Sequence, residues 1–174
     1  MADAKKAMSQ FRGDLTDILP RLWRFALALC RDAVMAEDLV QETCRRALER
    51  QGQFQPGSRL DHWVFAIMVS IRRNDLRRDR VRRGNGLEDP ATLHADEGEG
   101  ILANILKSQL FAQVAALSEV QREAVMLVYA EGMSYAEAAQ ILDVPLGTVM
   151  SRLAAAKETL AARMNPTDRR MARI

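Results

Sequence analysis

The stretch SYAEAAQILDVPLGTVMSRLAAAKETL, residues 134–160, contains two segments in which apolar residues recur with helical spacing, separated only by Asp143-Val144-Pro145. A break this short makes the two helices cross instead of continuing as one. Ser134 and Glu137 fit a capping box, which satisfies free N–H groups at the start of the first helix. The stretch therefore predicts a helix-turn-helix motif.

The second helix of this motif is expected to present a surface to DNA. Its inward stripe consists of Val149, Leu153, Ala156 and Leu160. Four outer residues then remain near the helix N-terminus, the end that enters a major groove: Thr148, Ser151, Arg152 and Ala155. Backbone N–H groups there meet phosphate, and an arginine reads a guanine edge through two hydrogen bonds. The alternative is a structural helical hairpin that binds no nucleic acid.

The rest of the chain is helical by the same criterion, since no segment alternates with the period of a strand. Three N-terminal stripes have the spacing of a helix face: Leu22, Phe25, Ala26 and Leu29; Val40, Cys44, Ala47 and Leu48; and Leu60, Val64, Ile67 and Ile71. Three such helices close a small bundle. Pro20, like the other prolines, is expected at a helix boundary.

Charge and composition divide the chain. Residues 84–106 contain five Asp or Glu, no Lys or Arg and several glycines, which is typical of a linker. Residues 1–83 contain 17 Lys or Arg against 11 Asp or Glu. We therefore predict an all-α protein with two small helical domains, an N-terminal helical bundle at 1–83 and a C-terminal helix-turn-helix domain at 107–174, joined by a flexible acidic linker.

Several functional classes are disfavoured. The longest apolar run, residues 63–69, is far shorter than a membrane span, so we expect a cytoplasmic protein without membrane insertion. Cys30 and Cys44 lack metal or redox spacing, and His62 and His94 have no partners at metal or triad spacing. The sequence accordingly predicts no metal, no cofactor and no enzyme active site.

Two further segments suit macromolecular partners. IRRNDLRRDRVRR, residues 71–83, contains seven arginines, and Arg73, Asn74 and Arg77 share a face that suits DNA. AEDLVQETCRRALE, residues 36–49, has an acidic, amide-bearing outer face that suits a basic protein surface. Taken alone, each segment is also typical of a solvated helix face.

The order of these segments resembles that of a known family, the extracytoplasmic-function sigma factors of bacterial RNA polymerase. AEDLVQETCRRALE resembles the family's core-binding segment, and LDHWVFAIMVSIRRNDLRR resembles the segment that recognises and melts the minus-ten element. LSEVQREAVMLVYAEGMSYAEAAQILDVPLGTVMSRL is similar to the reader of the minus-thirty-five element. The resemblance runs from Leu19 to Leu160, apart from the linker.

The resemblance implies a role for each site residue. Contacts to core RNA polymerase would come from Asp38, Leu39, Gln41 and Glu42. The loop at 52–60 would capture a flipped base, and contacts to the minus-ten element would come from Phe54, Gln55, Trp63, Arg73, Asn74 and Arg77. Contacts to the minus-thirty-five element would come from Thr148, Ser151, Arg152 and Ala155. Met150, Ala154 and Ala155 replace polar or basic residues of the family, so readout there would rest on DNA shape.

The implied function is transcription initiation, in which the protein directs core polymerase to promoters and opens them, while phosphodiester chemistry stays with the polymerase. The expected partners are core RNA polymerase, promoter DNA and an anti-sigma factor. Two other classes compete with this interpretation. A sigma-like module that only sequesters an anti-sigma factor usually carries a receiver domain, for which we expect no room. A stand-alone repressor would leave the N-terminal half without a task.

Overall fold

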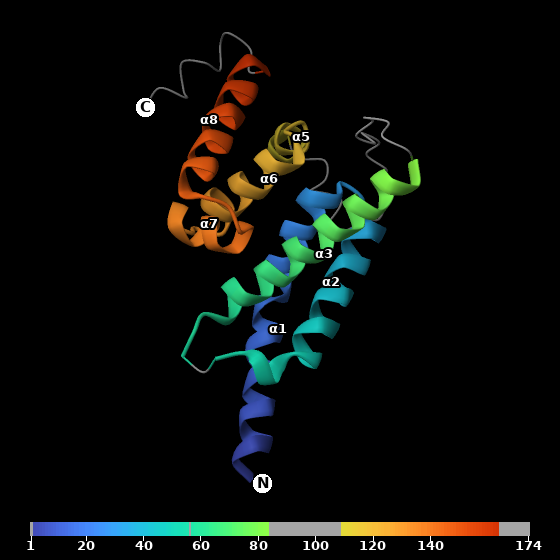
Figure 1. Ribbon diagram of the computed structural model, residues 1–174, viewed down its shortest axis with the longest axis vertical. Coiled ribbons are helices and arrows are strands. Elements are labelled where there is room, and N and C mark those ends of the chain that lie inside the picture. Colours follow the sequence, from blue (N-terminus) through green and yellow to red (C-terminus); the bar gives the residue numbers. More distant parts are fainter. Residues whose placement is uncertain (1, 56, 84–108, 164–174) are drawn as a thin grey trace. The chain divides into compact units, whose positions relative to one another are not determined.

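The computed structural model describes residues 2–55, 57–83 and 109–163. Every regular element in these residues is a helix, which confirms the predicted all-α fold (Figure 1). The chain divides into two compact units, residues 1–94 and 95–174. The predicted acidic linker at 84–106 lies outside the described residues, and the domain limits at residues 83 and 107 stay predictions.

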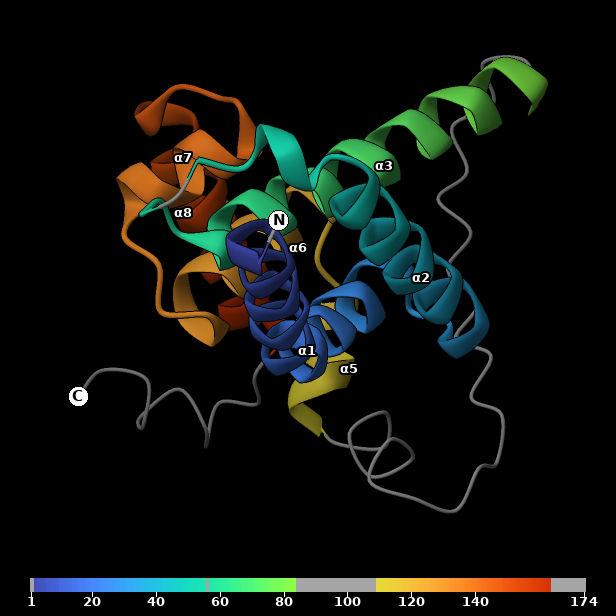
Figure 2. The ribbon, with the colours of Figure 1, turned by 90° about the horizontal axis from the view of Figure 1, so that it is seen from below.

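The N-terminal unit is a bundle of three long helices. α1 (Ala2–Cys30) packs against both α2 (Ala33–Glu49) and α3 (Leu60–Arg83), and α2 packs against α3 (Figures 1 and 2). A short 3-10 helix, η1 (Gln51–Gln53), begins the loop from α2 to α3. The apolar stripe of α1 is wholly buried and belongs to the core of the unit.

The core of this unit confirms two of the three predicted stripes. The whole α1 stripe is buried: Leu22, Phe25, Ala26 and Leu29. On α3, Val64, Ile67 and Ile71 are buried, and Leu60 is half-buried at the helix start. The rings of Phe25 and Phe65 meet edge to face, with centroids 5.1 Å apart, an arrangement that aromatic pairs favour.

Two local predictions for this unit are wrong. Pro20 lies inside α1, so packing of the helix along its apolar stripe overrides the tendency of proline to end a helix. The buried face of α2 consists of Ala36, Leu39, Thr43 and Ala47. Leu48, which was expected in the core, is exposed. Thr43 tolerates burial because its hydroxyl donates to the Leu39 carbonyl at 2.7 Å.

The described part of the C-terminal unit consists of short helices around one longer helix. Its elements are α5 (Gln109–Ala115), α6 (Glu119–Val125), the π-helical turn η2 (Met126–Ala130), α7 (Tyr135–Leu142) and α8 (Leu146–Arg163). α8 packs against both α6 and α7. The long helix is thus held by two partners from the same unit.

The helix-turn-helix prediction is confirmed by the ends of these helices. A capping box forms at the predicted site, the start of α7, where the Ser134 N–H donates to Glu137 Oε2 at 2.7 Å, and a second one forms at the start of α6. Gly132 has φ +68°, a conformation that glycine adopts without a steric penalty, and it turns the chain before α7. Asp143 ends α7 in the left-handed conformation, and α8 begins three residues later.

A fully buried arginine fixes α5 against α6. Arg122 donates through Nη1 to the Ala115 carbonyl at 2.9 Å and to the Leu117 carbonyl at 2.7 Å. Carbonyls at the end of a helix have no partner within the helix, so a charged donor is well placed there. The unit therefore contains a buried polar network in addition to its apolar core.

Candidate nucleic-acid and protein interfaces

The outward face of α2 presents polar side chains. Asp38 and Gln41 are exposed, and Gln41 Nε2 donates to Glu37 Oε1 at 3.1 Å. Within the described residues, Asp38 forms no ion pair. Leu39 is only 6% exposed and lies in the bundle core. Its side chain is therefore not available to a partner, contrary to the expectation from the sequence.

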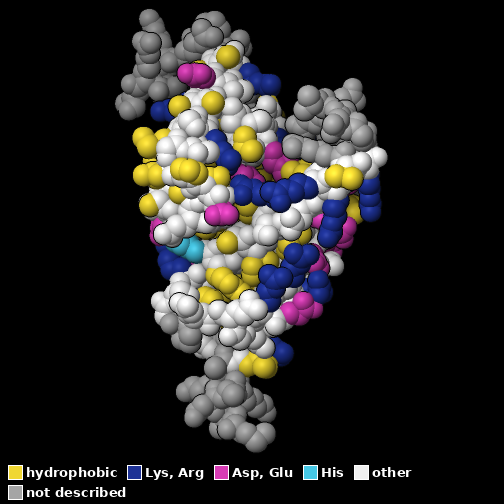
Figure 3. Space-filling model, in the orientation of Figure 1, with side chains coloured by type: hydrophobic (Ala, Val, Ile, Leu, Met, Phe, Trp, Pro, Cys, Tyr) yellow, Lys and Arg dark blue, Asp and Glu magenta, His cyan; other side chains and the backbone are white. Residues whose placement is uncertain are grey.

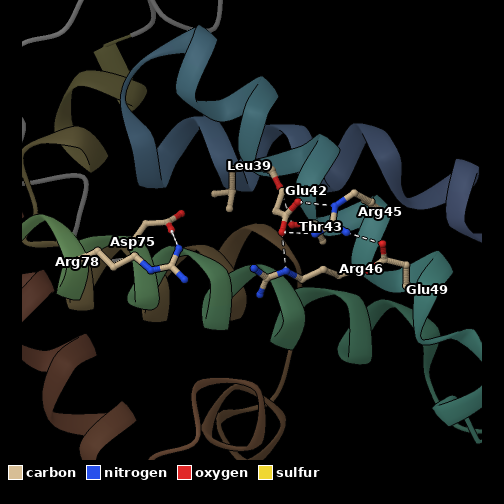
Figure 4. A network of polar contacts seen from close by, with 8 residues as sticks. All are labelled: Leu39, Glu42, Thr43, Arg45, Arg46, Glu49, Asp75 and Arg78. Carbon is tan, nitrogen blue, oxygen red and sulfur yellow. Dashed lines mark hydrogen bonds and ion pairs between the residues drawn. The ribbon is translucent and has the colours of Figure 1, made fainter.

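Glu42 stands at the centre of a charge network on the same helix (Figure 4). Arg45 donates to both carboxylate oxygens of Glu42 at 2.8 Å, and Arg46 Nε donates at 2.6 Å. Arg45 also pairs with Glu49. Hydrogen bonds from Arg45 first, and then from Arg46, lower the pKa of Glu42 to about 2. Glu42 is therefore ionised at neutral pH and held in place by its own helix.

The outward face of α3 is basic. Its exposed polar residues follow helical spacing: Ser70, Asn74, Arg77, Arg78 and Arg82; Val81, beside them, is exposed as well. Arg73 is half-buried at the edge of this face, so the predicted trio of Arg73, Asn74 and Arg77 lies on one side of the helix. Asp75 pairs with Arg78 at 3.6 Å and offsets part of the charge (Figure 4). Figure 3 shows Lys and Arg side chains, interspersed with carboxylates, where α2 and α3 run.

Aromatic rings anchor the loop between α2 and α3. The ring centroid of Phe54 lies 5.6 Å from that of Trp63 and 5.8 Å from that of Phe11, a residue of α1. Both predicted rings are half-buried and pack on protein, whereas Gln55 is exposed. Sequence reasoning missed Phe11, because no local spacing connects it to the loop.

Asp61 fixes the end of the same loop. Its carboxylate pairs with Arg59 at 2.8 Å and with Arg21 of α1 at 3.1 Å. Burial opposes ionisation of this carboxyl, but hydrogen bonds from Arg59 and Arg21 outweigh burial and lower its pKa to about 2. The Arg21 guanidinium also lies over the Phe65 ring, 5.6 Å from its centroid.

On α8 the predicted inward residues are confirmed, because Val149, Leu153 and Ala156 are buried and Leu160 is half-buried. Ser151 is exposed, and its hydroxyl donates to the Thr148 carbonyl at 3.0 Å. Thr148 and Ala155 are half-buried beside it. The exposed neighbours are Gly147, Met150 and Ala154. This face of α8 therefore carries mostly small side chains, which permit close approach.

Arg152 does not lie on that face, and its expected outward orientation is wrong. Its side chain is 17% exposed, and Nη1 lies 3.6 Å from Oε2 of Glu123, which is 2% exposed on α6. An opposite charge inside the unit draws the guanidinium away from solvent. Helical periodicity could not reveal this, because Glu123 belongs to another helix.

Both units match known sequence families. Residues 15–82 match Sigma-70 region 2, and residues 107–160 match Sigma-70, region 4. The ECF RNA polymerase sigma factor EcfG of Rhodopseudomonas palustris is 39% identical over 153 residues, which cover 87% of this chain and 83% of the relative. The chain belongs to the extracytoplasmic-function sigma factors.

Other sigma factors match over a similar extent. SigC of Mycobacterium tuberculosis is 32% identical over 149 residues, covering 84% of this chain and 79% of the relative. The structure of the sigma factor RpoE from Bartonella quintana, in complex with the anti-sigma factor NepR, aligns with a TM-score of 0.70 at 32% identity and covers 88% of this chain and 95% of that chain. CnrH, in complex with the cytosolic domain of CnrY, aligns with a TM-score of 0.64 at 22% identity and shares the fold.

This sigma factor is thus a transcription initiation factor of RNA polymerase. Its region 2 match begins within α1 and ends within α3, so it includes the α2 face, the loop and the basic helix. Phe11 precedes that match. Among the helices of the described residues, none is long and apolar enough to cross a membrane.

Proposed function

We propose that this sigma factor binds core RNA polymerase through the outward face of α2, opens the minus-ten element with α3 and the preceding loop, and reads the minus-thirty-five element with α8. The observation that carries the proposal is the match to both sigma regions, each over elements with an exposed polar face. The protein acts in the cytoplasm and adds no catalytic residue, because bond formation belongs to the polymerase.

The polymerase contact uses Asp38, Gln41 and Glu42. Their side chains point away from the bundle core, and the arginines beside Glu42 hold its carboxylate in one orientation. An acidic, amide-bearing face favours a basic protein surface and disfavours phosphate. Leu39 contributes to this contact indirectly. Its burial in the core fixes the rotation of α2 about its axis and so directs the polar face outward.

The minus-ten contact uses the side of α3 that carries Arg73, Asn74 and Arg77. Arginine binds phosphate, and asparagine pairs with an adenine edge. Gln55 is one of the exposed polar side chains of the loop, and in this proposal it receives the unstacked base. Phe54 and Trp63 form the apolar support of that position.

The minus-thirty-five contact uses the N-terminal part of α8. Thr148, Ser151 and Ala155 bring the helix close to the groove, and Arg152 stabilises the helix through Glu123. With few side chains long enough to reach base edges, selection relies on phosphate contacts and DNA shape. Binding of this unit to free DNA is then weak and salt-sensitive.

An anti-sigma factor regulates the protein in this proposal. The Bartonella quintana RpoE structure, which aligns over most of this chain, contains the anti-sigma factor NepR. We extend that mode of control to this chain, with an inhibitor of the same kind covering polymerase-binding and DNA-binding faces.

The test is transcription of a genomic fragment library by purified core polymerase, with and without the protein. We expect discrete start sites that share two upstream motifs, and loss of these starts with an Asp38→Ala, Gln41→Ala variant. Asp17→Ala removes an exposed carboxylate from α1 and serves as the matched control. Absence of starts with the wild-type protein, or full activity of the α2 variant, would refute the proposal.

A further inference from the structure

Phe11, near the N-terminal end of α1, contacts two residues of the proposed minus-ten site, Phe54 and Trp63. Its side chain is 8% exposed, and its ring lies 5.8 Å from Phe54 and 6.2 Å from Trp63, edge-on to both. Phe54 and Trp63 are 5.6 Å apart, so the three rings form a closed cluster, here called the aromatic clamp. Figure 1 shows the loop between α2 and α3 beside α1, in agreement with the Phe11–Phe54 contact.

The aromatic clamp determines what the loop presents. Phe54 follows η1, and its N–H donates to the Gln51 carbonyl at 3.1 Å. This hydrogen bond fixes the backbone from which the Phe54 ring projects. Gln55 and Ser58 on the other side are exposed, and the Ser58 N–H donates to the Gln55 carbonyl at 3.1 Å. The Arg59–Asp61 pair secures the end of the loop. The loop is thus anchored at two points, with a polar rim between them.

We propose that Phe11 is a positioning residue for promoter opening, which acts by holding the aromatic clamp together before DNA binds. This inference rests on the proposed function and assigns a role to a residue that precedes the region 2 match. Without Phe11, the Phe54 ring loses one of its two aromatic partners. The loop must then be ordered when the unstacked base arrives, and that entropy cost slows opening.

The experiment compares a duplex promoter with the same promoter carrying a pre-melted minus-ten element. With Phe11→Ala, we expect opening of the duplex, followed by fluorescence of a base analogue, to slow by about fivefold to tenfold, as expected from the loss of two aromatic contacts. Initiation from the pre-melted template should stay within about twofold of wild type. Phe11→Tyr keeps the ring and should restore duplex opening.

Leu15→Ala is the matched control, since Leu15 lies one turn along α1, is 5% exposed and carries no aromatic ring. It tests whether any loss of apolar packing in α1 has the same effect. Phe11→Leu keeps apolar volume without a ring and replaces the alanine variant if that variant unfolds. Phe11→Ala and Phe54→Ala combined should slow opening by less than the product of the single effects.

Three results separate the possible outcomes. Equal slowing by Leu15→Ala and Phe11→Ala, or equal slowing on both templates, would overturn the positioning role. Wild-type protein that is inactive on both templates would instead refute the proposed function. Hydrogen exchange tests, without polymerase, whether the aromatic clamp orders the loop. Phe11→Ala should speed exchange of the Phe54 and Ser58 amides. Unchanged exchange of these amides would contradict the ordering role of the clamp.

Discussion

Asp61 joins three segments of the N-terminal unit through one carboxylate. Arg21 reaches it from α1, Arg59 reaches it from the loop, and the residue itself lies in the first turn of α3. A carboxylate at the start of a helix also interacts favourably with the helix dipole. Because these contacts favour the ionised form, they stabilise the fold only while Asp61 carries its charge.

Asp61→Asn should therefore lower the free energy of unfolding at neutral pH by up to about 2 kcal/mol. The folded pKa, about 2, lies below the ordinary value of 3.8, so the wild-type advantage is present above that value and fades as pH falls toward the folded pKa. Urea unfolding at several pH values measures the difference. Asp17→Asn, at an exposed site on α1, should leave the free energy of unfolding at neutral pH within about 0.5 kcal/mol of wild type. A constant difference down to pH 2 would contradict the role of the charge.

At the scale of elements, the sequence predicted the features that depend on neighbouring residues and missed those that depend on contacts between helices. The turn between α7 and α8 was predictable because caps and proline act within a few residues. The rotation of α2 was mispredicted because its buried face uses Thr43 and two alanines, while Leu48 is exposed. The Arg152–Glu123 pair and the aromatic clamp join residues far apart along the chain, and no spacing rule indicates such contacts.

Ser134→Ala tests the start of α7. The substitution removes the hydroxyl that accepts from the Glu137 N–H at 3.2 Å, and such a loss costs about 1 kcal/mol. Thermal unfolding should show a lower Tm for the C-terminal unit. Ser70→Ala, at an exposed position inside α3, should leave Tm unchanged or slightly higher. Equal effects of the two changes would argue against the cap.

Substitutions in the Glu123–Arg152 pair test how much this ion pair contributes to the packing of α8 against α6. Glu123→Gln and Arg152→Met should each destabilise the C-terminal unit by about 2 kcal/mol, because each removes one charge from a largely buried ion pair. The double variant should lose less than the sum of the two. Denaturant unfolding gives these values, with Glu158→Gln on the exposed side of α8 as control. Strict additivity would show that the two side chains act independently.

At the scale of the whole molecule, we expect transcription to depend on the segment that connects the two compact units. The predicted linker at 84–106 lies outside the described residues, but its charge and composition are those of a spacer. Deleting ten residues from it should impair transcription while both units keep their unfolding transitions. Replacing the linker with a Gly/Ser sequence of the same length distinguishes an effect of linker length from an effect of linker charge. Unchanged transcription after the deletion would contradict the spacer role.

The aromatic clamp also gives the protein an intrinsic optical probe. The chain contains two tryptophans, and one of them, Trp63, belongs to the clamp. In a Trp23→Phe background, all indole emission of this chain would come from the site where the strand is proposed to open. A change in solvent exposure or a base stacked on the ring would then shift or quench that emission. Stopped-flow mixing with unlabelled promoter DNA could thus follow the loop in real time, without attaching a dye to either partner.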